Sequence, residues 1–578
     1  MHHRTPPLLA LIVAAALLAG SCSASVSLNV GETAGSTGAP TDGSTGTIST
    51  TEGSGGTSPS TAPPPTPPPA KEPQYGGTLT YAIEADSLNP WTPQFTAIAV
   101  SGYMVMRSVF DPLAMPTDDL DVRGYLLESI RHNDDYTVWT LTVRDGITFH
   151  DGTPLDGNAV ATNLELHRTS PVTANFVGDI ASVEANGDIV VVTTRRPWVS
   201  FPVTLTGQVG LIASPSWLAR VAEDPTAMLE PVGTGPFVFE SYTPGVSFAA
   251  TRNEDYWRPA LPYLDRVEFV VKNNIADRSQ ALLDGTANII HTANGDEIAK
   301  FRNRLGAFSM VEAREFGETT YVLLNAGNPT SPVSDVNVRR AMAHALDFDI
   351  IKTARNGGVL EVPNGPFQPG SIGYLEDTGF PTYDPDLAQQ LVAEWEAENG
   401  PLQITFTTTS DEFNLISAEL YARFWEAVGI DVTLTTIEQS QYIGLALVGS
   451  FEAYFWRLHS GFDPDQQYQW WISENARDYG TVASNFGRIR DASIDENLVT
   501  IRTTADPEAR RLAAEAINRR FADQVYNIWL GWAITAIIFD PSVQDVNTGF
   551  TLPDGAPVLP TGVGIGGTHQ IAQIWIDQ

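Results

Sequence analysis

The residue types that most often perform catalysis or bind metals occur in this chain, but their spacing supports neither role. The nine histidines are scattered, with no H-E-x-x-H pair and no Cys/His cluster that could ligate zinc. The chain has neither a phosphate-binding P-loop nor a G-x-S-x-G nucleophile elbow. The tripeptide His150-Asp151-Gly152 is typical of a turn. We therefore expect no catalytic residue, no metal site and no cofactor.

One reactive side chain does have an informative position: Cys22, the only cysteine of the chain. It follows a positive charge at Arg4, an apolar run over residues 8–19 and the small residues 19–21. This order is typical of a secretory signal peptide, here residues 1–21. The apolar run is shorter than the ~20 residues that a membrane-spanning helix needs. We therefore expect export, with Cys22 at the cleavage point.

The residues before Cys22 resemble the bacterial lipobox, in which the cysteine receives a diacylglycerol and becomes the new N-terminus. Ala19 departs from that motif, which usually has leucine there. The resemblance implies lipidation of Cys22 and anchoring to the outer face of the cell membrane (the periplasmic side if there are two membranes). The alternative is plain secretion with an incidental cysteine. Residues 22–73 are dominated by Ser, Thr, Gly and Pro, which predicts a disordered tether.

Composition limits what the rest of the chain can bind. The formal net charge is −35, which argues against a basic surface for nucleic acid or anionic lipid. A hydrophobic content of 42% is ordinary for a folded protein. About 500 residues follow the tether, which is enough for two or three domains with large cores.

Hydrophobic patterning predicts mixed strands and helices in this folded part. Residues 138–143 alternate as a strand, and Asp145-Gly146 indicates a hairpin whose return strand contains Ile147 and Phe149. A helix is expected to begin at Asp335 or Asn337. Further on, residues 402–438 read as strand, helix and strand, which favours a sheet flanked by helices.

Seven stretches carry a family resemblance in order and spacing: GGTLTYAI…SLNPW from Gly76, VRDGITFHDGTPL from Val143, VGTGPFVFESYTPG…RNEDYW from Val232, LLDG from Leu282, LNAGNPTSPVSDVNVRRAMAHALDFDII from Leu324, YDPDLAQQL from Tyr383 and FWRLHSGFDPDQ from Phe455. Together they resemble the bacterial extracellular solute-binding proteins of family 5, the oligopeptide, dipeptide and nickel group that serves ABC importers. The resemblance extends from about residue 74 to the C-terminus.

The resemblance implies an α/β (mixed α+β) fold, the type II periplasmic-binding-protein fold, with two lobes joined by a two-segment hinge. Lobe I is expected at residues 74–272 plus 528–578, with an accessory subdomain inserted at about 109–206. Lobe II is expected at 273–527. The chain should cross between lobes near residues 270–272 and 529–532. Such proteins close on a ligand like a clamp.

The same resemblance places ligand-facing residues in both lobes. The cleft candidates are Gln94, Phe95, Thr96, Phe176, Tyr442, Trp456, Arg457, Leu458, Ser460 and Phe462. The aromatic members supply faces that can stack on a ligand, although aromatic residues near a domain interface are more often core. Peptide-binding relatives have an aspartate at the position of Ser460, where it pairs with the free amine of the peptide. The ligand therefore lacks that amine, or another acid replaces the aspartate.

Three classes of function follow from these observations. The leading one is a monomeric, non-enzymatic, membrane-tethered receptor that delivers a peptide or peptide-sized solute to ABC permease subunits. The same fold with an amine-free solute such as an oligosaccharide, or a surface sensor or envelope regulator, is the alternative. A secreted hydrolase has little support because no nucleophile–base pair or paired carboxylates can be identified.

Overall fold

The computed structural model describes residues 71–87, 91–96, 100–313, 316, 318–354, 361–459, 461–548, 550–559 and 569–578. Lys71–Gln578 form one compact unit. The predicted signal peptide, Cys22 and the tether up to residue 70 lie outside the described residues. So does Ser460.

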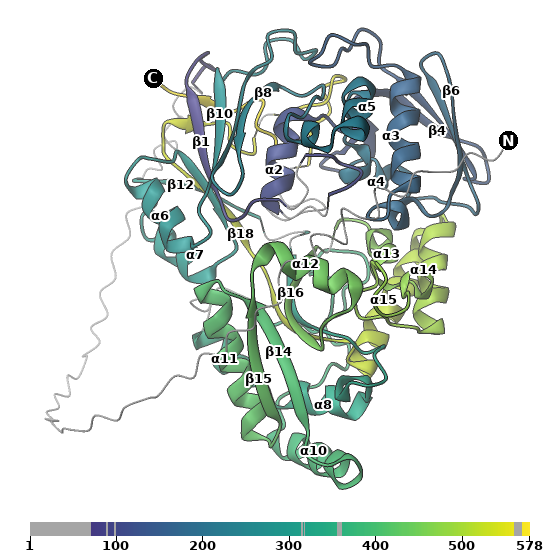
Figure 1. The fold of residues 1–578 in the computed structure, drawn as a ribbon, viewed down its shortest axis with the longest axis vertical. Coiled ribbons are helices and arrows are strands. Elements are labelled where there is room, and N and C mark those ends of the chain that lie inside the picture. The colour runs from purple at the N-terminus through teal and green to yellow at the C-terminus, as the bar shows by residue number, and fades with distance from the viewer. Residues whose placement is uncertain are drawn as a thin grey trace, which may run out of the picture. The chain divides into compact units, whose positions relative to one another are not determined.

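Lobe I is built on a seven-stranded sheet (Figure 1). Its order is β12 (Ser309–Ala313), β18 (Thr535–Phe539), β11 (Ile289–Thr292), β1 (Thr78–Ile83), β10 (Arg266–Val271), β9 (Ser247–Arg252) and β8 (Phe237–Thr243). β1 runs parallel to both β10 and β11, whereas the other pairings are antiparallel. A small two-stranded pair of β19 (Val543–Gln544) and β20 (Trp575–Ile576) lies near the C-terminus.

Helices bury both faces of this sheet, as expected when parallel strands sit at its centre. Tyr81 packs in a core with residues of α2 (Val100–Val109) and α5 (Pro215–Glu223). Ala82, the next residue of β1, points to the other face and packs with α6 (Ile275–Leu283) and α7 (Gly295–Arg302).

An inserted subdomain of lobe I carries a four-stranded antiparallel sheet with its own core. The order is β4 (Leu127–His132), β5 (Val138–Val143), β7 (Ile189–Thr194) and β6 (Ile180–Asn186), with α3 (Gly157–Thr169) and α4 (Phe201–Thr204) packed nearby. The short strands β2 (Ala114–Pro116) and β3 (Val122–Gly124) form a separate antiparallel pair.

The predicted hairpin after β5 is wrong. β5 pairs with β4 on one side and β7 on the other, so no edge remains for Ile147 and Phe149. Both side chains are buried in the subdomain core from a loop that contains only an isolated bridge. The Asp145-Gly146 signal does mark a turn, with Gly146 at a φ of 78°, but a turn signal does not specify the strand that follows.

Lobe II is built on a five-stranded sheet. Its order is β15 (Asp431–Ile437), β14 (Gln403–Thr409), β16 (Ala453–His459), β13 (Glu318–Leu324) and β17 (Asn527–Trp532). The parallel β14–β15 pair, joined through α11 (Glu412–Ala427), confirms the predicted strand–helix–strand run. Asp335 caps the N-terminus of α8 (Val336–His344), which confirms one of its two predicted starts.

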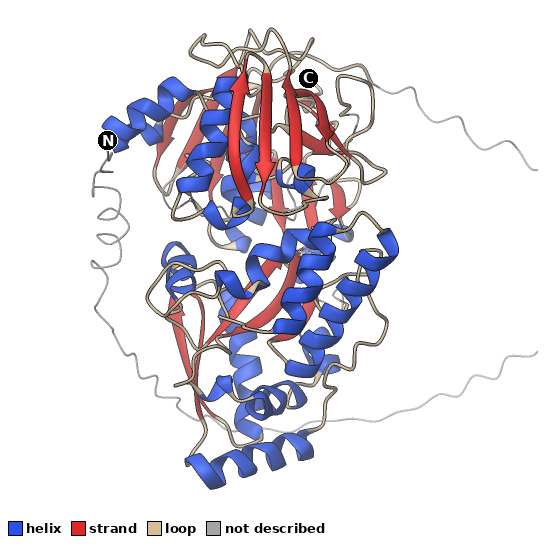
Figure 2. Cartoon of the chain, turned by 90° about the vertical axis from the view of Figure 1, so that its right-hand side faces the viewer, coloured by secondary structure: helices blue, strands red, loops and turns tan. Residues whose placement is uncertain are grey.

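Helices cover both faces of the lobe II sheet. One core contains residues of α8, α10 (Pro385–Asn399) and α11, with α9 (Phe348–Ala354) beside it. The other contains residues of α12 (Gln439–Val448), α13 (Tyr468–Trp471), α14 (Ala492–Thr503) and α15 (Pro507–Gln524). Figure 2 shows helices of this second group in front of the strands of lobe II.

The strand pairing corrects the predicted first crossing between lobes. The family resemblance predicts residues 273–313 in lobe II, but β11 and β12 both pair with β18 in the sheet of lobe I. The chain therefore leaves lobe I between Ala313 and Glu318, and it returns between Trp532 and Thr535. Two short connections thus join the lobes.

Candidate functional site

A cavity of about 690 Å³ lies between the lobes. Lobe I and its subdomain contribute Glu84, Thr96, Tyr103 and Phe176, among others. Lobe II contributes residues of β13, β16, α11 and α12. This volume is within the range of ~300–1,000 Å³ that is usual for small-molecule sites.

Strand β16 gives the cavity two chemically different walls. Successive side chains of a strand point to opposite faces, so Trp456 and Arg457 are presented on opposite sides of the lobe II sheet. Trp456 pairs in register with Tyr321, and both belong to the aromatic core beside α12. Arg457 pairs with Thr320 on the other face. Trp456, Arg457 and Thr320 all line the cavity.

On the Arg457 face, an ionic cluster joins the two lobes. Nη1 of Arg457 donates to Oε2 of Glu318 at 3.2 Å, within lobe II. Nη2 donates to Oε1 of Glu84 at 3.3 Å, across to the residue that follows β1 in lobe I. The guanidinium of Arg278 approaches the other oxygen of Glu84 at 3.8 Å. Arg457 is thus shared between carboxylates of both lobes.

The cluster keeps Glu84 and Arg457 charged. Burial raises the pKa of Glu84, but Arg457 and the other positive groups nearby outweigh it and lower that pKa to about 2, from an ordinary value of 4.5. Glu318 raises the pKa of Arg457 against the opposing effect of burial. Burial lowers the pKa of His291, which lies next to the cluster on β11. At neutral pH, Glu84 and Arg457 therefore form an ion pair.

This depressed pKa makes a prediction about acid stability. Above pH 4.5 the ion pair makes its full contribution to the protein's free energy of unfolding. That contribution should be lost as the pH falls from about 4.5 to about 2. Glu84→Gln removes the titrating group, so this variant should be less stable than the wild type at pH 7 and should lose less stability on acidification. Urea unfolding at about pH 7 and pH 3 measures both differences.

Glu240→Gln is the matched control, because Glu240 pairs with Arg266 at 2.6 Å on the surface of the same lobe. An exposed pair contributes little, so this variant should follow the wild type at both pH values. An unchanged pH dependence in Glu84→Gln would contradict the assignment.

On the Trp456 face, aromatic side chains form a continuous row. Tyr442 stacks on Trp456 with ring centroids 5.4 Å apart, and Trp456 meets Phe486 edge to face at 5.2 Å. Trp470 lies 5.2 Å from Phe486, and Phe176 of the subdomain meets Trp470 at 5.6 Å. All five line the cavity. This wall suits an apolar or aromatic group of a ligand.

The structure places the sequence-derived site residues in three groups. Thr96, Phe176, Tyr442, Trp456, Arg457 and Leu458 line the cavity. Gln94, Phe95 and Phe462 are not on its wall as the structure describes it. Ser460 lies outside the described residues.

The residues off the wall have structural contacts instead. The side-chain amide of Gln94 donates to Oδ1 of Asn163 at 2.7 Å, and its backbone oxygen accepts from the hydroxyl of Ser170 at 2.6 Å. Phe462 packs against Val203 and Phe316 beside the lobe boundary. Gln94 and Phe462 therefore help to shape the cleft without facing it.

Sequence reasoning missed the acids of the cavity wall. Glu84, Glu318, Asp411 and Glu438 come from segments far apart in the chain, and each stands next to the end of a strand. A charged residue at a strand end is an ordinary feature, so no local signal marked them. Among the residues that the structure describes, no cluster of His, Cys, Asp and Glu could hold a metal ion. Within that same part of the chain, no helix has the length and apolarity to span a membrane.

Comparison with known proteins identifies the class. The sequence model of the bacterial extracellular solute-binding proteins, family 5 (middle region), matches residues 121–480. The chain belongs to this family, which confirms the resemblance noted in its motifs. The family consists of solute-binding proteins, so the prediction of a binding protein rather than an enzyme is also confirmed.

Individual relatives agree with this class. A putative ABC transporter peptide-binding protein of Brucella ovis is 27% identical over 441 residues, which cover 71% of this chain and 79% of the relative. The agropinic acid complex of AgaA from A. tumefaciens R10 has a TM-score of 0.75 at 22% identity, covering 87% of this chain and 99% of that one. DppA of Helicobacter pylori, solved with the peptide STSA, has a TM-score of 0.76 at 20% identity over 87% of this chain and 99% of that one. These structures confirm the predicted fold class.

Proposed function

We propose that this protein captures a peptide or peptide-sized solute in the interlobe cavity and delivers it to the permease of an ABC importer. The observation that carries the proposal is the cavity of about 690 Å³ with walls from both lobes. A protein that closes around its ligand needs ligand contacts from both lobes. Relatives of this chain include a putative ABC transporter peptide-binding protein and a glutathione-binding protein, which supports the proposal. Lipidation at Cys22 would hold the receptor at the membrane, where the permease is.

The charge of the cavity favours a solute with a positive group. Acidic residues outnumber arginines on the described part of its wall: Glu84, Glu318, Asp411, Glu412, Glu438 and Asp465, against Arg278, Arg457 and Arg502. A protonated amine gains a charge-assisted hydrogen bond from such an acid. The cavity therefore has carboxylates on its wall even though position 460 is a serine. Of the two explanations for the missing aspartate, the wall supports replacement by another acid.

Calorimetry tests this proposal. We expect unmodified tri- and tetrapeptides with one aromatic side chain to bind at least tenfold more tightly than the same peptides with acetylated N-termini, a difference of about 1.4 kcal/mol or more. Mass spectrometry of the solute that co-purifies with the protein gives an independent answer. Equal binding of the acetylated peptides, or a co-purified oligosaccharide, would contradict amine recognition and favour the amine-free alternative.

A further inference from the structure

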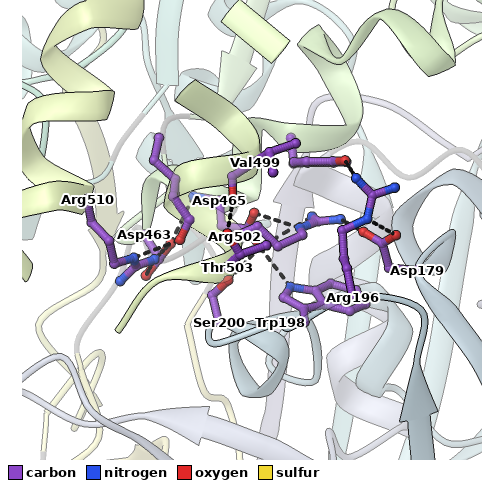
Figure 3. Close-up of polar contacts among 12 residues, drawn as sticks. Asp179, Arg196, Trp198, Ser200, Asp463, Asp465, Val499, Arg502, Thr503 and Arg510 are labelled. Atoms are coloured by element: carbon purple, nitrogen blue, oxygen red, sulfur yellow. Dashed lines mark hydrogen bonds and ion pairs between the residues drawn. The ribbon is translucent and has the colours of Figure 1, made fainter. Parts of the chain in front are cut away.

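Away from Arg457, a second charged network joins the lobes, centred on Arg502 of α14 (Figure 3). Nη1 of Arg502 donates to Oδ2 of Asp179 in the subdomain at 2.8 Å. Its Nε donates to Oδ1 of Asp465 in lobe II at 2.9 Å. These three side chains are only 4–5% exposed. The contact is therefore a desolvated ion-pair network at the boundary between lobes.

The subdomain adds neutral contacts to the same groups. The indole of Trp198 and the hydroxyl of Ser200 donate to Oδ2 of Asp465 at 2.9 and 2.6 Å. The backbone N–H of Val199 donates to the carbonyl of Arg502 at 2.9 Å. The guanidinium of Arg502 lies 4.4 Å from the ring centroid of Trp198. Asp465 and Arg502 of lobe II thus fit a polar socket of the subdomain.

Each side of this contact also holds a charge pair of its own. Asp179 accepts from Nε of Arg196 at 2.8 Å within the subdomain, and Asp465 pairs with Arg502 within lobe II. Removing one partner of a buried pair leaves an uncompensated charge, which is strongly destabilising. Separation of the lobes, by contrast, would leave the pairs Asp179–Arg196 and Asp465–Arg502 intact. Each pair has no net charge, and water can hydrate it. The contact can therefore open and close without leaving an unpaired charge on either side.

We propose that Asp179, Arg196, Trp198, Ser200, Asp465 and Arg502 form an interlobe latch, which holds the clamp closed and sets how slowly it releases its solute. Four of its members, Asp179, Arg196, Trp198 and Ser200, are not on the described cavity wall, whereas Asp465 and Arg502 line it. Most residues of the latch therefore join the two lobes directly, at positions that do not line the solute cavity. Among the strands that the structure describes, the chain passes between the lobe sheets at two short connections. Contacts between the lobes therefore influence the balance between the open and closed arrangements.

Asp179→Asn tests the latch because it removes the charge facing Arg502 and keeps the shape of the side chain. The interlobe distance can be measured by pulsed electron paramagnetic resonance between spin labels on Asp188→Cys in the subdomain and Glu398→Cys in lobe II. Both sites are exposed. In a Cys22→Ala full-length background these are the only thiols. We expect the open-to-closed ratio to rise about tenfold in Asp179→Asn, equivalent to about 1.4 kcal/mol.

Asp463→Asn is the matched control. Asp463 forms a similar, part-buried pair with Arg510 at 2.8 Å, but both residues belong to lobe II. The asparagine keeps a side-chain oxygen that can accept from the backbone N–H of Asp465, as Asp463 does at 2.9 Å. This variant should keep the distance distribution of the wild type. Ser200→Ala, which removes a single hydrogen bond across the boundary, should shift the distribution in the same direction as Asp179→Asn but less. The latch is refuted if Asp179→Asn leaves the distances unchanged, or if Asp463→Asn shifts them equally.

Discussion

Replacing Arg457 with glutamine should weaken solute binding at least tenfold and lower the free energy of unfolding at pH 7 by about 1–3 kcal/mol. The reason is the position of Arg457 between Glu84 of lobe I and Glu318 of lobe II. Without the guanidinium, two carboxylates face each other across the lobe boundary with less counter-charge. The expected loss of stability is smaller than for a fully buried ion pair because the side chain of Arg457 is 36% exposed.

Arg340→Gln provides the matched control. The side chain of Arg340 is also 36% exposed and pairs with Asp523 at 3.2 Å, but on the outside of lobe II. Its loss should cost less than about 1 kcal/mol and leave binding unchanged. Urea unfolding and calorimetry with the co-purified solute measure both effects. If the two variants behave alike, Arg457 is an ordinary surface charge.

A double variant separates the two consequences of losing Arg457. Glu84→Gln in the Arg457→Gln background removes the carboxylate that has lost its partner. Stability should then recover in part, because the free-energy changes caused by substitutions at two interacting residues are not additive. Solute affinity should not recover, since the charged wall of the cavity is still incomplete. Full recovery of binding would mean that Arg457 acts only by neutralising Glu84.

The ordered family motifs were sufficient to predict the fold class, but the lobe boundary depended on strand partners that no motif specifies. Residues 273–313 contain α6, β11, α7 and β12, which alternate helix and strand in the same way as lobe II. Their assignment is decided by β18, which pairs with β11 and β12 from more than 200 residues further along the chain. Such long-range pairing leaves no trace in local hydrophobic periodicity.

The candidate site shows the same division between local and distant information. Trp456 and Arg457 stand side by side in one recognisable strand, and the structure puts both on the cavity wall. Glu84 and Glu318 can be recognised as site residues only because both accept hydrogen bonds from Arg457. The contact with Glu84 depends on how the two lobes meet. Asp465, next to the Asp463-Pro464 turn, gave no signal either, because its partners Trp198 and Ser200 belong to the subdomain.

Cys22→Ala should transfer the protein from the membrane fraction to the soluble exported fraction. Each buried methylene of an acyl chain contributes ~0.8 kcal/mol to membrane attachment, and two or more chains give a stable anchor where one gives only marginal binding. Cys22 is the only thiol of the chain, so no second cysteine can take over the modification. The effect should therefore be nearly complete.

Fractionation followed by a carbonate wash measures the transfer, and the mass of the mature N-terminus shows whether the wild type carries acyl chains. Ser23→Ala is the control, since it changes the neighbouring residue and keeps the thiol; it should stay with the membrane. The folded unit of Lys71–Gln578 lies almost fifty residues beyond Cys22, so solute affinity should be the same in all three proteins. A Cys22→Ala protein that remains bound to membranes, or a wild type that is already soluble and unacylated, would overturn the lipid anchor and leave plain secretion.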